Sequence, residues 1–256
     1  MTQIAADSPA VAHGVGLFET MLVTRGRIIL APEHFARMHR SAELLGFPLP
    51  DHAAFDDELV RACACVVHDE VALRCLYVAG GATVDDRWTL AAQCTPIPPL
   101  TLARRTHARA ITLEPSLTRA LPQHKLTSYA PCVIGLRTAV VAGANEGLFI
   151  TPAAEVLEGT ATNVFAVAGN RLITAPVSAG VLPGTVRAWL LTEAARLGIE
   201  IEERPPTAAE ITTGALLTGS LTGVVPLRVL DGRPCGEATP LAQVLIQRWA
   251  AFATQA

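Results

Sequence analysis

One residue stands out for the chemistry that it could perform. Lys125 is the only lysine in a chain of 256 residues, and the other nineteen basic side chains among its Lys and Arg residues are arginines. Arginine stays protonated and is a poor nucleophile, whereas a desolvated lysine can lose its proton, attack a carbonyl and form a Schiff base. Composition alone leaves two interpretations open. Lys125 is a nucleophile that arginine could not replace, or it is a surface lysine retained by chance.

Three other short stretches could supply partners for such an amine. Gly184-Thr-Val stands at the expected start of a helix, where backbone amides can hold a phosphate. Gly219-Ser220 could add a hydroxyl donor, and Glu158 stands before a glycine close to a strand. Each alone is more often a turn, a loop or a surface charge. Together, an amine, an anion site and an acid are what pyridoxal phosphate requires for its aldehyde, its phosphate and its ring nitrogen.

Composition narrows the class of protein. Half of the residues are hydrophobic and 17% are charged, which predicts a compact globular chain. A formal net charge of −3 gives no electrostatic footprint for nucleic acid. No apolar run reaches the length of a membrane span, and the first residues lack the layout of a signal peptide. We therefore expect a cytoplasmic protein with neither nucleic acid nor membrane as a partner.

The cysteines do not predict a metal site. They stand at positions 63, 65, 75, 94, 132 and 235. Cys63 and Cys65 are one residue apart and lack a second Cys or His pair at the spacing of a zinc site. We expect reduced thiols that behave as small apolar side chains, and no metal.

The elements that must position these residues alternate between strands and helices. Before a stiff proline segment at residues 95–99, the patterns predict strands within 14–30 joined at Arg25-Gly26, helices over 31–46 and 55–67, and strands over 71–78 and 87–94. After it, they predict strands over 108–113, 147–151, 162–168, 171–174, 215–218 and 224–230, and helices over 132–142, 181–197 and 243–252. This mixture favours an α+β fold, with a small α/β domain over 1–96, a linker over 97–105 and a larger domain over 106–256.

Several motifs in this order resemble one family. They are Gly14–Thr20, Glu33–Ala42, Lys125, Glu158–Phe165, Leu182–Arg187 and Thr218–Ser220. On these motifs the chain resembles the class IV aminotransferases, the fold-type-IV pyridoxal-phosphate enzymes, over nearly its whole length. The resemblance implies two domains, a smaller α/β domain and a larger barrel-like α+β domain, with the cofactor at the domain interface. It also implies a homodimer acting on a small-molecule amino substrate.

The resemblance assigns roles around the cofactor ring. Lys125 would form the Schiff base and act as the acid and base. Glu158 would pair with the pyridine nitrogen, and Leu182 would pack against the ring. Tyr129 looks like the family tyrosine whose hydroxyl approaches the phenolic oxygen of the cofactor.

The resemblance also assigns the phosphate. Arg37 would bind it, together with the backbone amides of Thr185 and Val186 and the side chain of Ser220. The chain departs from the family pattern in three places. Only thirteen residues precede Gly14, and Val15 replaces the acidic or small polar residue often found between the two glycines. Val186 lacks the hydroxyl that many members place there, so its amide alone could contribute.

The reaction stays open between two outcomes of one α-proton removal by Lys125. The chain length and the run Phe18-Glu-Thr-Met21 look more like 4-amino-4-deoxychorismate lyase, which releases pyruvate and 4-aminobenzoate for folate biosynthesis. The alternative is an aminotransferase for branched-chain or D-amino acids. A non-catalytic binding protein that keeps the fold is a third interpretation, motivated by the short N-terminal segment.

Overall fold

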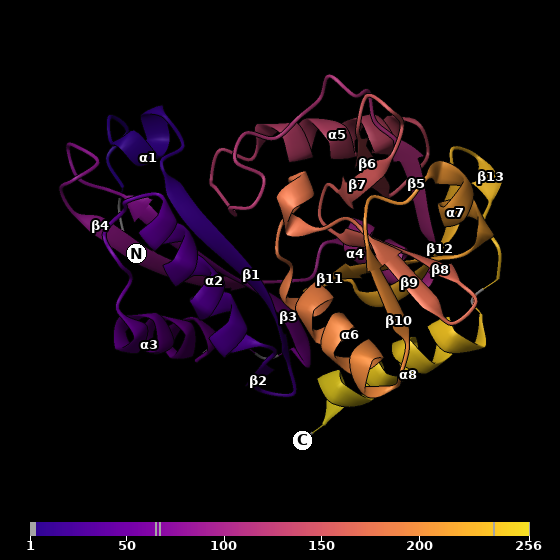
Figure 1. Cartoon of the computed structure of the whole chain (residues 1–256). Helices are drawn as coiled ribbons and strands as arrows, with labels where there is room; N and C mark the ends of the chain where they lie inside the picture. Colours follow the sequence, from indigo (N-terminus) through magenta and orange to yellow (C-terminus); the bar gives the residue numbers. More distant parts are fainter. Residues whose placement is uncertain (1–3, 65, 67, 238, 256) are drawn as a thin grey trace. The chain divides into compact units, whose positions relative to one another are not determined.

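The chain folds into two compact units. A computed structural model describes residues 4–64, 66, 68–237 and 239–255 (Figure 1). The first unit contains residues up to 97 together with 124–129, and the second contains 98–123 and 130–255. The sequence predicts one division, at residues 97–105. In the structure most of that stretch is a helix, α4 (Pro99–Thr106), and the segment around Lys125 belongs to the first unit.

The first unit is built on a four-stranded antiparallel sheet. Its strand order is β2 (Arg27–Ile28), β1 (Gly16–Thr24), β3 (Glu70–Ala79) and β4 (Trp88–Thr95). The turn between β1 and β2 has positive φ at both central residues, 49° at Arg25 and 75° at Gly26. Positive φ at both positions is the geometry of a type I′ hairpin turn. The predicted tight turn at Arg25-Gly26 is thereby confirmed.

Three helices accompany this sheet, α1 (Pro9–Ala12), α2 (Ala31–Leu44) and α3 (His52–Cys63), and α2 and α3 pack on its apolar face. Successive residues of a strand face opposite sides, so Leu17 and Met21 of β1 meet Met38 and Phe55 of the helices. Helix α3 begins three residues earlier than predicted, because the Asp51 carboxylate accepts the amide of Ala54 at 2.8 Å. Cys65 and Val67, in the predicted end of this helix, lie outside the described residues.

The second unit is a barrel-like sheet. Its strands are β5 (Ala108–Thr112), β6 (Glu146–Ile150), β7 (Val156–Gly159), β8 (Asn163–Ala168), β9 (Arg171–Thr174), β10 (Glu200–Glu203), β11 (Ala215–Gly219), β12 (Gly223–Leu230) and β13 (Arg233–Pro234). Eight of them run in the order β10-β9-β8-β11-β12-β5-β6-β7, and β13 pairs with β12 off this path. The pairing of Glu158 with Asn163 joins β7 back to β8. Aliphatic side chains such as Leu148, Val164 and Leu217 fill the interior. The predicted α+β class is confirmed.

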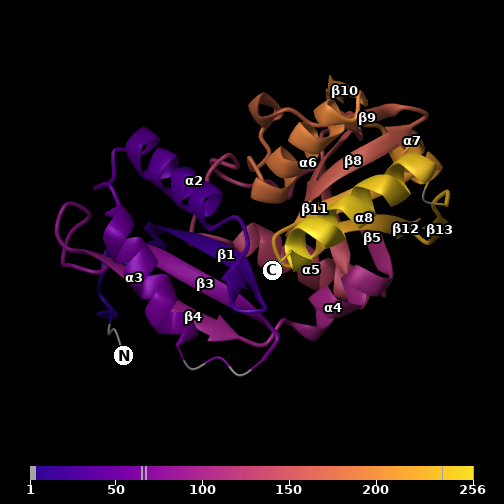
Figure 2. The ribbon, with the colours of Figure 1, turned by 90° about the horizontal axis from the view of Figure 1, so that it is seen from below.

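Helices cover this sheet: α5 (Ala130–Val141), α6 (Thr185–Arg196), α7 (Ala208–Thr213) and α8 (Pro240–Thr254), with a 3₁₀ turn at Val177–Ala179. Helices α6 and α8 lie side by side (Figure 2). Their contact is aromatic, since the ring centroids of Trp189 and Trp249 are 5.0 Å apart and nearly perpendicular. An edge-to-face pair of this kind adds to the stabilisation from burial.

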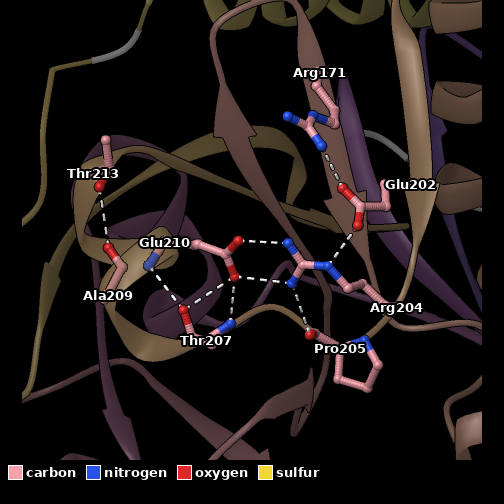
Figure 3. A network of polar contacts seen from close by, with 8 residues as sticks. All are labelled: Arg171, Glu202, Arg204, Pro205, Thr207, Ala209, Glu210 and Thr213. Atoms are coloured by element: carbon pink, nitrogen blue, oxygen red, sulfur yellow. Dashed lines mark hydrogen bonds and ion pairs between the residues drawn. The ribbon is translucent and has the colours of Figure 1, made fainter.

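Residues 200–213, for which the sequence predicts no element, are held by charges (Figure 3). Thr207 caps α7, and Glu210 returns a bond to the Thr207 amide at 2.8 Å, which completes a capping box. Glu210 also accepts two bonds from the Arg204 guanidinium, at 2.5 and 3.0 Å. Hydrogen bonds from Arg204 and from Thr207 lower the pKa of Glu210 to about 2. The same arginine continues through Glu202 to Arg171, which ties α7 to the edge strand β10.

Removing the cap should destabilise this region. We expect Thr207→Ala to lower the free energy of unfolding by about 1 kcal/mol, because the first turn of α7 loses its side-chain acceptor. Urea denaturation followed by circular dichroism measures the change. Thr192→Ala is the matched control, since Thr192 is exposed within α6 and should change stability by less than about 0.5 kcal/mol. Equal effects of the two substitutions would contradict the capping role.

Candidate active site

Lys125 lies on a short extended segment beside strand β1. The amide of Phe18 donates to the carbonyl of Lys125 at 2.9 Å, and the amide of Thr127 donates to the carbonyl of Gly16 at 2.9 Å. Leu17 and Leu126 form an antiparallel bridge between these two bonds. The hydroxyl of Thr127 adds a bond to the carbonyl of Gly14 at 2.7 Å. The backbone on both sides of Lys125 is therefore fixed to the start of β1.

The amine of Lys125 lies against two aromatic rings. Its Nζ atom is 4.5 Å from the ring centroid of Phe18 and 5.3 Å from that of Tyr129. The two rings meet edge to face, 5.1 Å apart at 86°. Aromatic faces attract a cation and exclude water around it. The predicted pair of Lys125 and Tyr129 is thus brought together within the first unit.

Arg74 is a residue of this surface that the sequence interpretation missed. Its guanidinium carbon lies 4.3 Å from the ring centroid of Phe18, on the sheet face that carries Lys125. Burial lowers the pKa of Arg74, and the nearby Tyr129 opposes that shift. The available signal was strand alternation: Thr20 pairs with Arg74 and Phe18 with Leu76, so all four face one side.

Arg37 belongs to a buried charge cluster between α2 and β1. Its guanidinium donates to both oxygens of Glu19, from Nε at 2.9 Å and from Nη2 at 2.5 Å. His34 lies one helical turn earlier, and its Nδ1 is 2.6 Å from Glu19 Oε2. All three side chains are buried. A bidentate pair holds a guanidinium in one orientation, so Arg37 is a fixed positive group rather than a mobile surface charge.

The cluster shifts the pKa values of its members. Burial raises the pKa of Glu19, but the charges and hydrogen bonds of Arg37 and His34 outweigh it and lower that pKa to about 2. Burial lowers the pKa of His34, against the attraction of Glu19, and the positive charges of Arg37 and Lys125 lower it further. We infer that His34 is neutral near pH 7 and that its Nδ1–H donates to Glu19.

Glu158 is a buried carboxylate of the second unit. It is only 3% exposed, and the amide of Leu182 donates to its Oε2 at 3.0 Å. Asn163, its partner across the β7–β8 pair, donates to the same oxygen at 3.3 Å and to the Leu182 carbonyl at 2.9 Å. The structure therefore brings the predicted Glu158 and Leu182 into direct contact. The N–H of Leu182 is bonded to the Glu158 carboxylate and its C=O to the Asn163 side-chain amide, so both backbone groups of Leu182 are fixed.

Arg119 is the other residue that the sequence interpretation missed. Its guanidinium forms an ion pair and hydrogen bond with Glu158 Oε1, and both side chains are largely buried. The two residues also line a cavity of about 170 Å³ with Pro122, Phe149 and Gly180. A guanidinium beside a carboxylate stabilises its negative charge, and a protonated ring nitrogen needs an anion as its partner. The two residues are 39 positions apart, so sequence spacing gave no signal for the pair.

The predicted phosphate donors of the second unit lie at the start of a helix and in the loop of a hairpin. Helix α6 begins at Thr185, followed by Val186, with Gly184 as the N-cap residue. A glycine has no side chain to cap the helix, and a Cβ there would lie 2.1 Å from Asn163 Oδ1. Ser220 stands in the loop between β11 and β12.

A buried hydroxyl shows that this region suits an additional polar group. Thr218 is 1% exposed, and its Oγ1 has no hydrogen-bond partner within the described residues. A buried polar atom without a partner is costly, and a bound acceptor would relieve that cost. Thr218 directly precedes Gly219-Ser220 in the chain, so the residues present fit a phosphate.

The described ranges hold neither a membrane-spanning helix nor a cluster of three or more His, Cys, Asp or Glu residues able to bind a metal. The cysteines at 63, 75, 94 and 235 are free thiols, and Cys65 lies outside the described residues.

Comparison with known proteins gives the family. Residues 16–230 match the model of the amino-transferase class IV family. The chain belongs to this family. It is 32% identical to the bifunctional aminodeoxychorismate lyase / D-amino acid transaminase of Mycobacterium tuberculosis, over 96% of this chain and 92% of that protein. It is 28% identical to a putative branched-chain-amino-acid aminotransferase of Methanocaldococcus jannaschii, over 90% of this chain and 84% of the relative.

Solved structures agree. A hypothetical aminotransferase from Mycobacterium tuberculosis, solved with α-ketoglutarate and pyridoxamine phosphate, matches with a TM-score of 0.87 at 30% identity. The match covers 99% of this chain and 94% of that one. The protein is therefore a pyridoxal-phosphate-dependent class IV enzyme with the fold-type-IV architecture. The interpretation as a non-catalytic binding protein is set aside.

The charge cluster of this class IV enzyme should make stability depend on pH. Glu19 has a lower pKa in the folded state than the value of about 4.3 in an unfolded chain, so its stabilisation is complete above about pH 5 and is lost as pH falls toward 2. His34 also binds its proton less readily when folded, so protonation below about pH 6.5 favours unfolding. The lowered pKa values of Glu19 and His34 both predict that the folded protein becomes less stable as the pH falls.

Glu19→Gln tests the larger contribution. At pH 7 it should lower the free energy of unfolding by about 3–5 kcal/mol, because it leaves Arg37 buried without its anion. The difference from the native protein should shrink as the pH falls below about 4, where Glu19 itself becomes protonated. Urea denaturation between pH 7.5 and 3 measures it, with Glu43→Gln on the exposed side of α2 as the control. A difference that does not vary with pH would refute the assignment.

Proposed function

We propose that the protein is a 4-amino-4-deoxychorismate lyase, which releases pyruvate and forms 4-aminobenzoate. The observation that supports it most is the similarity over nearly the whole chain to a bifunctional lyase and D-amino acid transaminase. The predicted residues include the amine, the acid and the phosphate-binding groups that either reaction needs. A D-amino acid transaminase activity is the second candidate, because the name of the same relative includes it.

Lys125 is the residue that moves the proton. Pyridoxal phosphate, when bound, supplies an electron sink for the charge left after a proton leaves the substrate carbon that bears the amine. Lys125 Nζ takes that proton, and the rings of Phe18 and Tyr129 limit the positions that the amine can occupy. A base held in one place needs less reorganisation before proton transfer.

Glu158 and the phosphate-binding residues would orient the cofactor. The Glu158 carboxylate would pair with the ring nitrogen and keep it protonated, while Arg119 stabilises the negative charge of Glu158. The amides of Thr185 and Val186, the Ser220 hydroxyl and the Arg37 guanidinium would bind the phosphate, and Leu182 would pack on the ring. Arg74 can hold a substrate carboxylate, which both 4-amino-4-deoxychorismate and an amino acid carry.

The lyase outcome follows from the substrate. When the proton has left, the bond between the ring carbon and the enolpyruvyl oxygen breaks, and its electrons leave with that oxygen. The six-membered ring becomes aromatic, and the enolpyruvyl group takes up a proton to become pyruvate. An amino acid has no such leaving group, so the same proton removal leads instead to amino-group transfer.

Lys125→Ala tests the central assignment. The purified protein with pyridoxal phosphate should be yellow, and the variant should lose the absorbance of lysine-bound cofactor. Turnover of 4-amino-4-deoxychorismate to 4-aminobenzoate and pyruvate should fall by at least ~10²–10⁴-fold, the usual contribution of a proton-transfer group. Lys125→Arg should be equally inactive, because arginine is neither a nucleophile nor a base at neutral pH.

Assays with two different substrates separate the lyase from the D-amino acid transaminase. Product formation from 4-amino-4-deoxychorismate supports the lyase, and conversion of D-alanine with 2-oxoglutarate supports the transaminase. If the native protein performs neither reaction, both proposals fail. If Lys125→Ala keeps either activity, the role of Lys125 is wrong. Circular dichroism of the variant excludes unfolding as the cause of a loss.

We also propose that the protein forms a homodimer through the outer face of α5. Val133, Ile134, Val140 and Val141 on this helix are exposed, with Val141 at 90%. Neighbouring exposed apolar side chains on one helix are typical of an interaction surface. The absence of a strong net charge leaves little electrostatic repulsion between two copies.

Two glutamate substitutions on the outer face of α5 should prevent dimer formation. We expect Ile134→Glu combined with Val141→Glu to convert a dimer into a monomer, because two buried carboxylates without partners would be too costly at an interface. Size-exclusion chromatography with light scattering measures the mass. Val60→Glu is the control, since Val60 is a similarly exposed valine on α3 of the first unit. A native monomer, or a variant that stays dimeric, would contradict the proposal.

A further inference from the structure

The last turn of helix α4 carries two arginines, Arg104 and Arg105, that both reach the loop carrying Ser220. Arg105 Nε donates to the carbonyl of Leu221 at 2.7 Å, and Arg104 Nη1 donates to the hydroxyl of Thr222 at 3.3 Å. The loop is the three-residue connection between β11 and β12, whose last pair is Gly219 with Gly223. Two guanidinium groups from a distant part of the chain thus hold a loop that has no regular backbone pairing of its own.

Arg104 links that loop to the turn at residues 160–162 of the barrel. It is 2% exposed and lies 3.5 Å from Glu146, which is fully buried. Glu146 in turn accepts the amide of Thr160 and the hydroxyl of Thr162, both at 2.9 Å. Residues 160–162 form the turn between Glu158 and Asn163. The buried pair therefore joins the turn beside Glu158 to the loop beside Ser220.

The loop has little room to move between these contacts. A Cβ at Gly219 would lie 3.0 Å from the carbonyl oxygen of Ala161. Gly223 has a φ of 79°, and a Cβ there would lie 2.6 Å from Trp249 Nε1. Both glycines are required by these close approaches, the second also by its left-handed backbone. Packing fixes the two ends of the loop, and the arginines fix its centre.

We propose that Arg105 is a positioning residue for the phosphate of the cofactor. Its bond to the Leu221 carbonyl sets the plane of the peptide between Leu221 and Thr222. In a trans peptide the C=O and N–H point in opposite directions, so the Thr222 N–H points away from Arg105. Ser220 and its neighbouring amides are thereby held in one arrangement, ready for an anion. This inference rests on the proposed function, because it takes the Ser220 loop as part of the phosphate site.

Arg105 is a better test position than Arg104. Removing Arg104 would leave Glu146 buried without its cation, which would destabilise the whole barrel. Arg105 is half-buried, and its bond to the loop ends on a neutral carbonyl rather than on a carboxylate. Thermal unfolding of Arg105→Ala without cofactor should therefore stay within a few degrees of the native protein, as for about 1 kcal/mol or less.

The experiment compares two cofactors that differ only in the phosphate. Cofactor-stripped full-length protein is titrated with pyridoxal phosphate and with pyridoxal, and the dissociation constants come from the absorbance of the lysine-bound form. We expect Arg105→Ala to weaken pyridoxal phosphate about three- to tenfold, as for one lost hydrogen bond. The constant for pyridoxal should change by less than about twofold, because its ring and aldehyde contacts are untouched.

Two further variants sharpen the result. Arg105→Lys should restore part of the affinity, since it keeps the charge but not the fixed planar donor. Arg109→Ala, on the neighbouring strand β5, removes an exposed arginine and should change neither constant.

The inference fails if Arg105→Ala weakens both cofactors equally, which would show a merely structural role, or if it weakens neither. A native protein that binds neither cofactor through Lys125 would instead refute the proposed function itself.

Discussion

A carboxylate buried in a protein must meet a cation, and three such pairs anchor the two units. Glu19 meets Arg37 beneath the first sheet, while Glu158 meets Arg119 and Glu146 meets Arg104 in the barrel. Desolvation of an ion costs several kcal/mol, so each pair is tolerated only where further hydrogen bonds complete it. At Glu19 this bond comes from His34, and in the barrel such bonds come from backbone amides, the Asn163 side chain and threonine hydroxyls, which fixes the turns that make them. The charges therefore order the loops as well as each other.

Two of these pairs also carry the chemistry that we propose. Glu158 receives a backbone amide from Leu182 and a side-chain amide from Asn163, so its orientation does not depend on the cofactor. Arg37 is held by both oxygens of Glu19, so the orientation of its guanidinium is fixed in the same way. A site whose groups are already ordered loses little conformational freedom when it binds or reacts. The buried pairs thus serve both stability and preorganisation.

Local signals in the sequence were enough for much of the fold. Arg25-Gly26 predicts a tight hairpin turn, and the structure has one because glycine and its neighbour both adopt positive φ. Helix α4 was missed, because a proline-rich segment predicts a linker, although Pro99 stands in its first turn, where proline is tolerated. Arg74 and Arg119 were missed for another reason. Their partners lie on other strands, and only the folded register brings such residues together.

The reaction is the part that residue types determine least. In the mechanism that we propose, removal of a proton by Lys125 is common to elimination and to amino-group transfer, so the same amine and acid serve both. The outcome depends on whether the bound molecule carries a group that can leave and a ring that can become aromatic. Aromatisation makes elimination effectively irreversible, whereas amino-group transfer is close to balanced. In that mechanism selectivity comes from the groups proposed to hold the substrate, such as the Arg74 guanidinium on the Phe18 face, rather than from the proposed catalytic lysine.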